Sequence, residues 1–277
     1  MALTGIDSTG SNRRSRGACV LLALCLASGV GRLSASEPFP GELPASFIGD
    51  APIEGGVASR AVLELHEGNA YVFRNSTRQE STEVTTNYDD IGLWKVVLAD
   101  TGRQLVLRGG REAPIVFRID GPEIVTPLDP AGEPWRVAGE IIRLQRTAEF
   151  RAIEPQLFLS GMYTYMADAG VFTECLTGWR LPVAMEEDNV ALEHAYLEAR
   201  ARPGESVRVS LEGRIVLRAG PDGSEPRRAL VPVRLAHAWP GRTCEDPGTA
   251  ESDRPPLPEP SASAVQKLVY VAAERAP

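Results

Sequence analysis

The first half of the chain alternates apolar and polar residues in short runs. Between residues 61 and 146 a turn sequence interrupts the alternation about every ten residues, for example at 67–69 and 120–122. A period of two residues is typical of strands that bury one face. The pattern therefore predicts an antiparallel meander of about six to eight strands. The expected strands include 61–65, 71–73, 93–98, 105–107, 115–119, 123–125 and 141–144.

This meander has no helical segment between its strands. Because a closed sheet leaves no unpaired edge, we expect a small lipocalin-like barrel over residues 37–152. Trp94 and Trp135 are candidates to fill or line its interior. Barrels of about eight strands or fewer are often filled by their own side chains. An interior that stays open would instead suit a lipocalin-like carrier of a small apolar ligand, which is the alternative function.

The second half combines strands with one helix. Asp188 is a candidate helix N-cap, and Pro203 followed by Gly204 marks the end of that helix. We expect an oligonucleotide/oligosaccharide-binding (OB) type barrel with one helix over residues 153–246, so the fold class is mainly β, with two small antiparallel β-barrel domains. The expected strands are 157–159, 162–165, 207–211, 214–217 and 230–235. The buried face of the helix should consist of Ala191, Leu192, Ala195, Tyr196 and Ala199.

The N-terminus has the features of an export signal. Three arginines at 13, 14 and 16 precede an apolar run at 17–27 that is too short to span a bilayer, and small residues follow it. We expect residues 1–36 to be a signal peptide, with a mature start near Ser36 or Glu37. This prediction places the protein in the periplasm or cell envelope. A retained single anchor is the alternative.

The four cysteines divide according to this prediction. Cys19 and Cys25 lie in the export segment, whereas Cys175 and Cys244 stay in the mature chain. Two thiols in an oxidising compartment most simply form a disulfide. The two are far apart in sequence and lack flanking cations, which favours a structural bond over a redox switch. Acylation of Cys25 would give outer-membrane association, but Leu24 stands where a small residue should precede an acylated cysteine.

Charge and composition exclude several partners. The chain has a formal net charge of −8, and it becomes more acidic once the arginine-rich export segment is removed. Nucleic acids and anionic membrane surfaces attract basic patches, which no stretch here supplies, so neither is an expected partner. The segment 247–277 is rich in proline, serine and acidic residues. We expect it to be mostly disordered, with a possible short strand at 267–271.

No motif for catalysis or metal binding stands out. The sequence has no Gly-x-Ser-x-Gly elbow and no glycine-rich loop before a helix, so we predict no enzyme activity and no cofactor. His66, His194 and His237 are too far apart in sequence for a typical ligand spacing, so no metal site is expected.

Two further groups have ordinary explanations. Met162 and Met166, beside two tyrosines, could form a thioether copper site, but core packing is the expected role. Asp168 and Glu174 flank Cys175 and could form a pair of acids. We interpret them as solvated turn carboxylates without a shifted pKa, and therefore not as catalytic groups.

A set of positions along the first half resembles the N-terminal domain of the NlpE family, the copper-resistance and envelope-stress lipoproteins. The matching positions are Gly49, Pro52, Leu63, Leu65, Tyr71, Gly92, Trp94, 105–110 and 143–144. In the second half, 165–169, 172–178, 182–184 and 192–196 look like the domain that follows in proteobacterial relatives. The resemblance implies a periplasm-facing, non-enzymatic protein, whose partners would be other envelope proteins.

One feature of that family is missing. Its members usually carry a Cys-x-x-Cys pair before the first long strand, where this chain has residues 51–57 with no thiol. Soft metals such as Cu(I) need sulfur ligands, which Ile53 and Glu54 cannot replace. We therefore expect an envelope protein of the NlpE type that does not bind copper at the usual motif.

Overall fold

The computed structural model describes residues 38–111, 113–220 and 225–246. The predicted signal peptide at 1–36 and the predicted disordered tail at 247–277 lie outside these residues. Among the described helices, none is long and apolar enough to cross a membrane.

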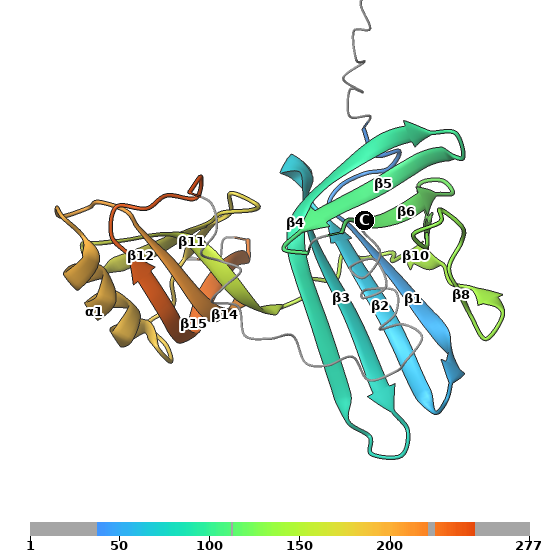
Figure 1. The fold of residues 1–277 in the computed structure, drawn as a ribbon, viewed down its shortest axis with the longest axis horizontal. Coiled ribbons are helices and arrows are strands. Elements are labelled where there is room, and N and C mark those ends of the chain that lie inside the picture. The colour runs from blue at the N-terminus through green and yellow to red at the C-terminus, as the bar shows by residue number, and fades with distance from the viewer. Residues whose placement is uncertain (1–37, 112, 221–224, 247–277) are drawn as a thin grey trace, which may run out of the picture. The chain divides into compact units, whose positions relative to one another are not determined.

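The N-terminal domain is a closed antiparallel barrel, drawn in blue to green in Figure 1. Its eight strands follow the order β1-β10-β7-β6-β5-β4-β3-β2, which confirms the predicted barrel. A short ribbon of β8 (Arg136–Val137) and β9 (Glu140–Ile141) precedes β10, and the 3-10 helix η1 (Glu67–Asn69) joins β2 to β3. The barrel strands are β1 (Ala45–Glu54), β2 (Val57–Leu65), β3 (Ala70–Gln79), β4 (Thr85–Ala99), β5 (Gly102–Gly109), β6 (Ile115–Ile119), β7 (Ile124–Pro127) and β10 (Leu144–Arg146).

Alternate residues of these strands fill the barrel. The inward positions carry large apolar side chains, among them Leu63, Leu65, Tyr71, Phe73 and Leu105, and these are almost completely buried. Trp94 packs in the same cluster, where its indole N–H donates to the His66 carbonyl oxygen at 3.3 Å, and Trp135 packs at its margin. A hollow in this interior has a volume of about 20 Å³ and is lined mostly by apolar residues. The barrel is thus a packed core.

The strands at the start of the barrel differ from the prediction. β1 was not predicted, because it contains glycine and proline and lacks alternation. The structure accommodates both residues: Pro52 lies where the pairing with β2 shifts register, and a Cβ at Gly49 would lie 2.5 Å from the Arg143 carbonyl oxygen. β3 and β4 extend through polar runs at 74–79 and 85–90, which gave no apolar period to detect.

The C-terminal domain is a five-stranded OB-type sheet with one helix, as predicted. Its strand order is β13-β12-β11-β14-β15, and a parallel bridge between Val183 and Leu230 connects the segment after β13 to β15. Helix α1 (Asn189–Ala199) packs against β15 and β11 and buries Leu192 and Tyr196 in the core (Figure 1). The strands are β11 (Gln156–Met166), β12 (Ala169–Glu174), β13 (Arg180–Pro182), β14 (Val207–Arg218) and β15 (Arg227–Trp239).

Two pairs of predicted strands are single strands in the structure. β11 runs straight through Gly161, where a Cβ would lie 2.4 Å from the Phe172 ring, and β14 runs through Gly213. Glycine weakens the interior of a strand, but here its missing side chain allows close contact with a neighbour. Strands β12 and β13 were not predicted.

Three side chains in this domain differ from their expected roles. Asp188 is the N-cap residue of α1, as predicted, but its carboxylate makes no capping hydrogen bond and instead accepts from the Leu235 amide at 2.7 Å. Met166 is not a core residue, since 66% of it is exposed at the last residue pair between β11 and β12. Ala191, expected on the buried face of α1, is also exposed.

Candidate functional site

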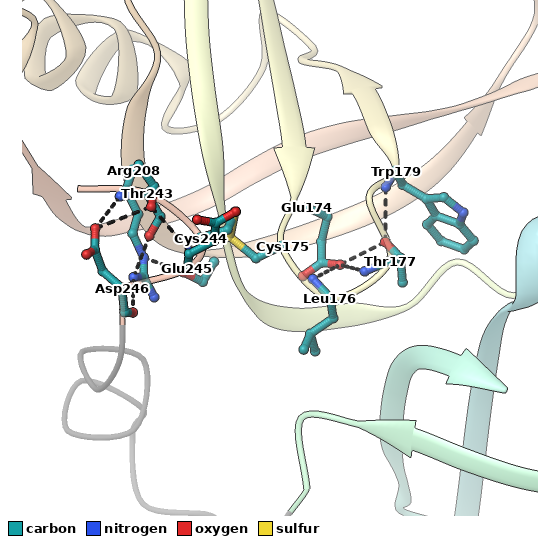
Figure 2. Close-up of a disulfide and its surroundings, with 11 residues drawn as sticks. Glu174, Cys175, Leu176, Thr177, Trp179, Arg208, Thr243, Cys244, Glu245 and Asp246 are labelled. Carbon is teal, nitrogen blue, oxygen red and sulfur yellow. Dashed lines mark hydrogen bonds between the residues drawn. A yellow bond between two sulfur atoms is a disulfide. The ribbon is translucent and has the colours of Figure 1, made fainter. Parts of the chain in front are cut away.

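The Cys175–Cys244 disulfide joins two ends of the OB sheet. Cys175 directly follows β12 and Cys244 follows β15, and their sulfurs are bonded with Cα atoms 5.4 Å apart (Figure 2). This separation is ordinary for a disulfide. The predicted pairing is confirmed, and it places a covalent bond beside two loops that other contacts also hold.

The loop that carries Cys244 is fixed by Arg208 of β14. The guanidinium of this buried residue donates from Nη1 to the carbonyl oxygens of Thr243, at 2.9 Å, and Asp246, at 2.8 Å. The Asp246 carboxylate in turn accepts from the Thr243 amide at 2.7 Å. Figure 2 shows these bonds on the side of the disulfide opposite Glu174. Arg208 therefore fixes the segment 243–246 that follows β15.

The loop that carries Cys175 is organised by Glu174. Its carboxylate Oε2 accepts from the amides of Leu176, at 3.0 Å, and Thr177, at 2.7 Å, and from the Thr177 hydroxyl at 2.8 Å (Figure 2). Only 2% of Glu174 is exposed. Burial raises the pKa of this carboxyl above its ordinary value, and the hydrogen bonds offset part of that rise.

The predicted role of Glu174 as a solvated turn carboxylate is therefore wrong. It is not paired with Asp168 either, because the exposed Asp168 contacts the Tyr165 hydroxyl at 3.3 Å. The sequence carried no signal for this burial, since the three donors come from the loop that follows Glu174 and become available only when that loop folds. The arrangement stabilises the loop and brings no second acid to Glu174.

The same loop ends at Trp179, which touches the barrel. The indole ring of Trp179 meets the imidazole of His66 edge-on, with ring centres 5.4 Å apart. The guanidinium of Arg228, from β15, lies 5.1 Å from the centre of the same indole. Trp179 thus lies against one residue of each domain.

Both of these neighbours bind Glu64, a fully buried carboxylate on β2. Glu64 accepts from Arg228 Nη2 at 2.5 Å, contacts His66 Nε2 at 2.8 Å and accepts from the Ile153 amide. Arg228 also donates from Nη1 to the Ile153 carbonyl oxygen at 2.9 Å. Burial lowers the pKa of Arg228, and the Glu64 charge opposes that shift. This buried cluster was not predicted.

The C-terminal domain and most of the chain are similar to known proteins. Residues 153–245 match the family model described as the NlpE C-terminal OB domain. The chain is also 29% identical, over 206 residues, to lipoprotein NlpE of Escherichia coli strain K12, covering 74% of this chain and 83% of that protein. The chain is therefore similar to the NlpE family, in its OB domain and over most of its length. The crystal structure of the Cpx pathway activator NlpE from Escherichia coli is 28% identical and covers 74% of this chain and 100% of that chain, with a TM-score of 0.31.

The other predicted positions lie apart from the disulfide. Residues 51–57, where the family resemblance predicts a Cys-x-x-Cys pair, form the end of β1, the turn at Gly55 and Gly56, and the start of β2. His194 is exposed, and its Nδ1 lies 3.3 Å from Oε1 of Glu198. The ring centres of His237 and Trp239 lie 4.6 Å apart, with the two rings tilted. Within the described ranges, no group of three or more histidine, cysteine or acidic residues is placed to hold a metal ion.

Proposed function

We propose that this chain is an exported cell-envelope protein that acts in envelope-stress signalling by contacting other envelope proteins, without catalysis. The observation that carries the proposal is the Cys175–Cys244 disulfide within the segment matched to the NlpE OB domain. Disulfides persist in oxidising compartments such as the periplasm. Its relative is named a lipoprotein, and the solved relative is named an activator of the Cpx pathway.

The proposed function does not include copper binding at the family's usual motif. Residues 51–57 supply no sulfur ligand, and the strand end and turn that they form hold only Glu54 as a charged side chain. Cu(I) prefers thiolate and thioether ligands. Signalling by this protein should therefore be independent of copper at that position.

The interior of the barrel does not favour the carrier alternative. A lipocalin-like carrier needs a continuous apolar cavity, and ligand pockets usually exceed about 300 Å³. The side chains clustered around Leu63, Tyr71 and Phe117 fill the interior instead. A hollow of about 20 Å³ suits a single water rather than a lipid.

Intact mass of the full chain, exported from a bacterial host, tests compartment and processing together. We expect a mature start near Ser36 or Glu37 and a gain of two hydrogen atoms on reduction. A start at Cys25 with added acyl mass would show a lipid-anchored form of the same envelope protein. An uncleaved chain with free Cys175 and Cys244 would contradict export.

A signalling assay tests the role itself. We expect overproduction of the exported chain in Escherichia coli to raise the output of a Cpx-responsive reporter above that of an empty vector. A chain without residues 1–36 is the matched control, because it carries the same domains but stays in the reducing cytoplasm. An exported, disulfide-bonded chain that leaves the reporter unchanged would contradict the proposal.

A further inference from the structure

We propose that Glu64 is the central group of a latch that holds the barrel and the OB domain together and that can release them as two intact domains. This latch does not depend on the proposed signalling function. It concerns the outer wall of the barrel over β2, β3 and β4, and the segment 153–156 that connects the two domains.

The outer wall of the barrel at this place is apolar, unlike a solvent-facing surface. Leu63 and Tyr71 point into the barrel, whereas their neighbours Val62 and Val72 belong with Ile91 to the hydrophobic cluster of the OB domain. Strand pairing sets Glu64 opposite Val72, and Val72 opposite Ile91. Side chains on both faces of these strands are therefore buried, which needs a second layer of protein.

Polar contacts surround this apolar strip and converge on the connecting segment. Glu64 accepts from the Ile153 amide, and Arg228 donates to the Ile153 carbonyl oxygen. On the next strands, Arg74 is paired with Asp89 at 2.6 Å and donates to the Glu154 carbonyl oxygen at 2.9 Å. Asp89 accepts from the amide of Gln156 at 2.9 Å. The start of the OB domain is thus bound to the barrel wall through its backbone.

Glu64 is the one carboxylate on which most of these partners depend. It is completely buried, and Arg228, His66 and the Ile153 amide all use its two oxygens. Removal of one member of a buried ion pair leaves an uncompensated charge, which costs far more than loss of an exposed pair. Loss of the Glu64 charge therefore favours an open state in which Arg228 returns to water.

The barrel itself does not need this carboxylate. Its core consists of inward side chains, its eight strands close on themselves, and the OB domain has its own core and disulfide. Opening should therefore separate two folded bodies and expose the strip formed by Val62, Val72 and Ile91. A group that offers Arg228 a better acceptor, such as an acidic peptide, would favour the same release.

Hydrogen exchange on the full-length, disulfide-bonded chain tests the latch. We expect Glu64→Gln to speed exchange of the Ile153 and Gln156 amides by about tenfold or more, while amides of Leu105 and Leu107 inside the barrel keep their protection. Asp50→Asn is the matched control, because Asp50 also pairs with an arginine, Arg60, but both side chains are about three-fifths exposed (62% and 59%). This control should exchange like the unmodified chain.

Arg228→Met provides a second test if Glu64→Gln fails to fold. It removes the cation and keeps an apolar stem, so the same two amides should again exchange faster while the barrel core stays protected. Unchanged exchange at Ile153 and Gln156 in the folded variants would overturn the latch. Loss of protection at Leu105 and Leu107 together with Ile153 would also overturn it, because the two domains would then unfold as one body.

Discussion

The barrel and the OB domain protect the edges of their sheets with different bonds. In the barrel, β1 pairs with both β2 and β10, so hydrogen bonds close the sheet completely. In the OB domain, β13 and β15 remain the ends of the strand order, and one bridge between Val183 and Leu230 joins them. The disulfide then ties the end of β15 to the end of β12. The barrel is therefore held together by its closed sheet and its core, whereas the OB domain also depends on a covalent bond.

Removal of the disulfide should give the largest difference between the domains. Closure of a loop with a sequence separation of 69 residues contributes roughly 4 kcal/mol in the chain-entropy model. We expect Cys175→Ser with Cys244→Ser to lower the free energy of unfolding of the OB domain by about that amount, with the barrel unaffected. Denaturant titration followed by exchange at Val209 and Leu105 would report each domain. Equal destabilisation of both would contradict this division.

A cavity in the barrel should have the converse effect. Leu105 is fully buried among the inward side chains, so Leu105→Ala should cost the barrel about 3 kcal/mol and leave the OB domain unchanged. Leu98→Ala is the control, because Leu98 lies on the neighbouring β4 and is 70% exposed. The same titration should show almost no change for the control. A large loss in the OB domain would show that the two cores are not separate.

The smallest expected effect is the pH dependence of stability that Glu174 causes in the loop beside the disulfide. Because burial raises the pKa of Glu174, the folded chain keeps this proton at a pH where the unfolded chain has released it. The free energy of unfolding therefore falls as pH rises above the ordinary carboxyl pKa, from about pH 4 upward. Glu174→Gln keeps an acceptor oxygen but does not ionise, so its stability should fall less over this range.

Thermal unfolding at several pH values would measure this difference. Glu140→Gln is the control, because Glu140 is exposed on β9. Its curve should follow that of the unmodified chain. Parallel curves for Glu174→Gln and the unmodified chain would show that the loop donors fully compensate the burial of the carboxylate.

The fold could be predicted where one rule determined the local structure. Alternation over 115–119 identified a barrel strand, because the residues on either side of the buried Phe117 are only partly covered. Helical spacing of Leu192 and Tyr196 identified α1. Cys175 and Cys244, the two cysteines outside the predicted export segment, identified the disulfide. In each case the local pattern agreed with the tertiary environment.

The rest depended on neighbours that the local sequence does not contain. β1 contains Gly49, which packs closely against the Arg143 backbone, and Pro52, which lies at a register shift. Both residue types disfavour strands, so local propensity does not predict β1. The burial of Glu174 could not be predicted, because its three donors come together only in the folded loop. The sequence around Glu64 does indicate that this part of the barrel wall is buried on both faces. Val62 and Val72 interrupt the polar face of their strands, and a continuous apolar run indicates burial on both faces.

The clamp of Arg208 on residues 243–246 has a mechanical consequence. β15 is an edge strand, so a pull on the chain after Asp246 would peel it from β14 one hydrogen bond at a time if nothing else held it. The Cys175–Cys244 bond and the Arg208 contacts instead pass the load to β12 and β14, where many bonds must break together. We expect single-molecule stretching of the oxidised chain to need a higher force than that of the reduced chain. Equal forces would show that β15 does not bear the load in either state.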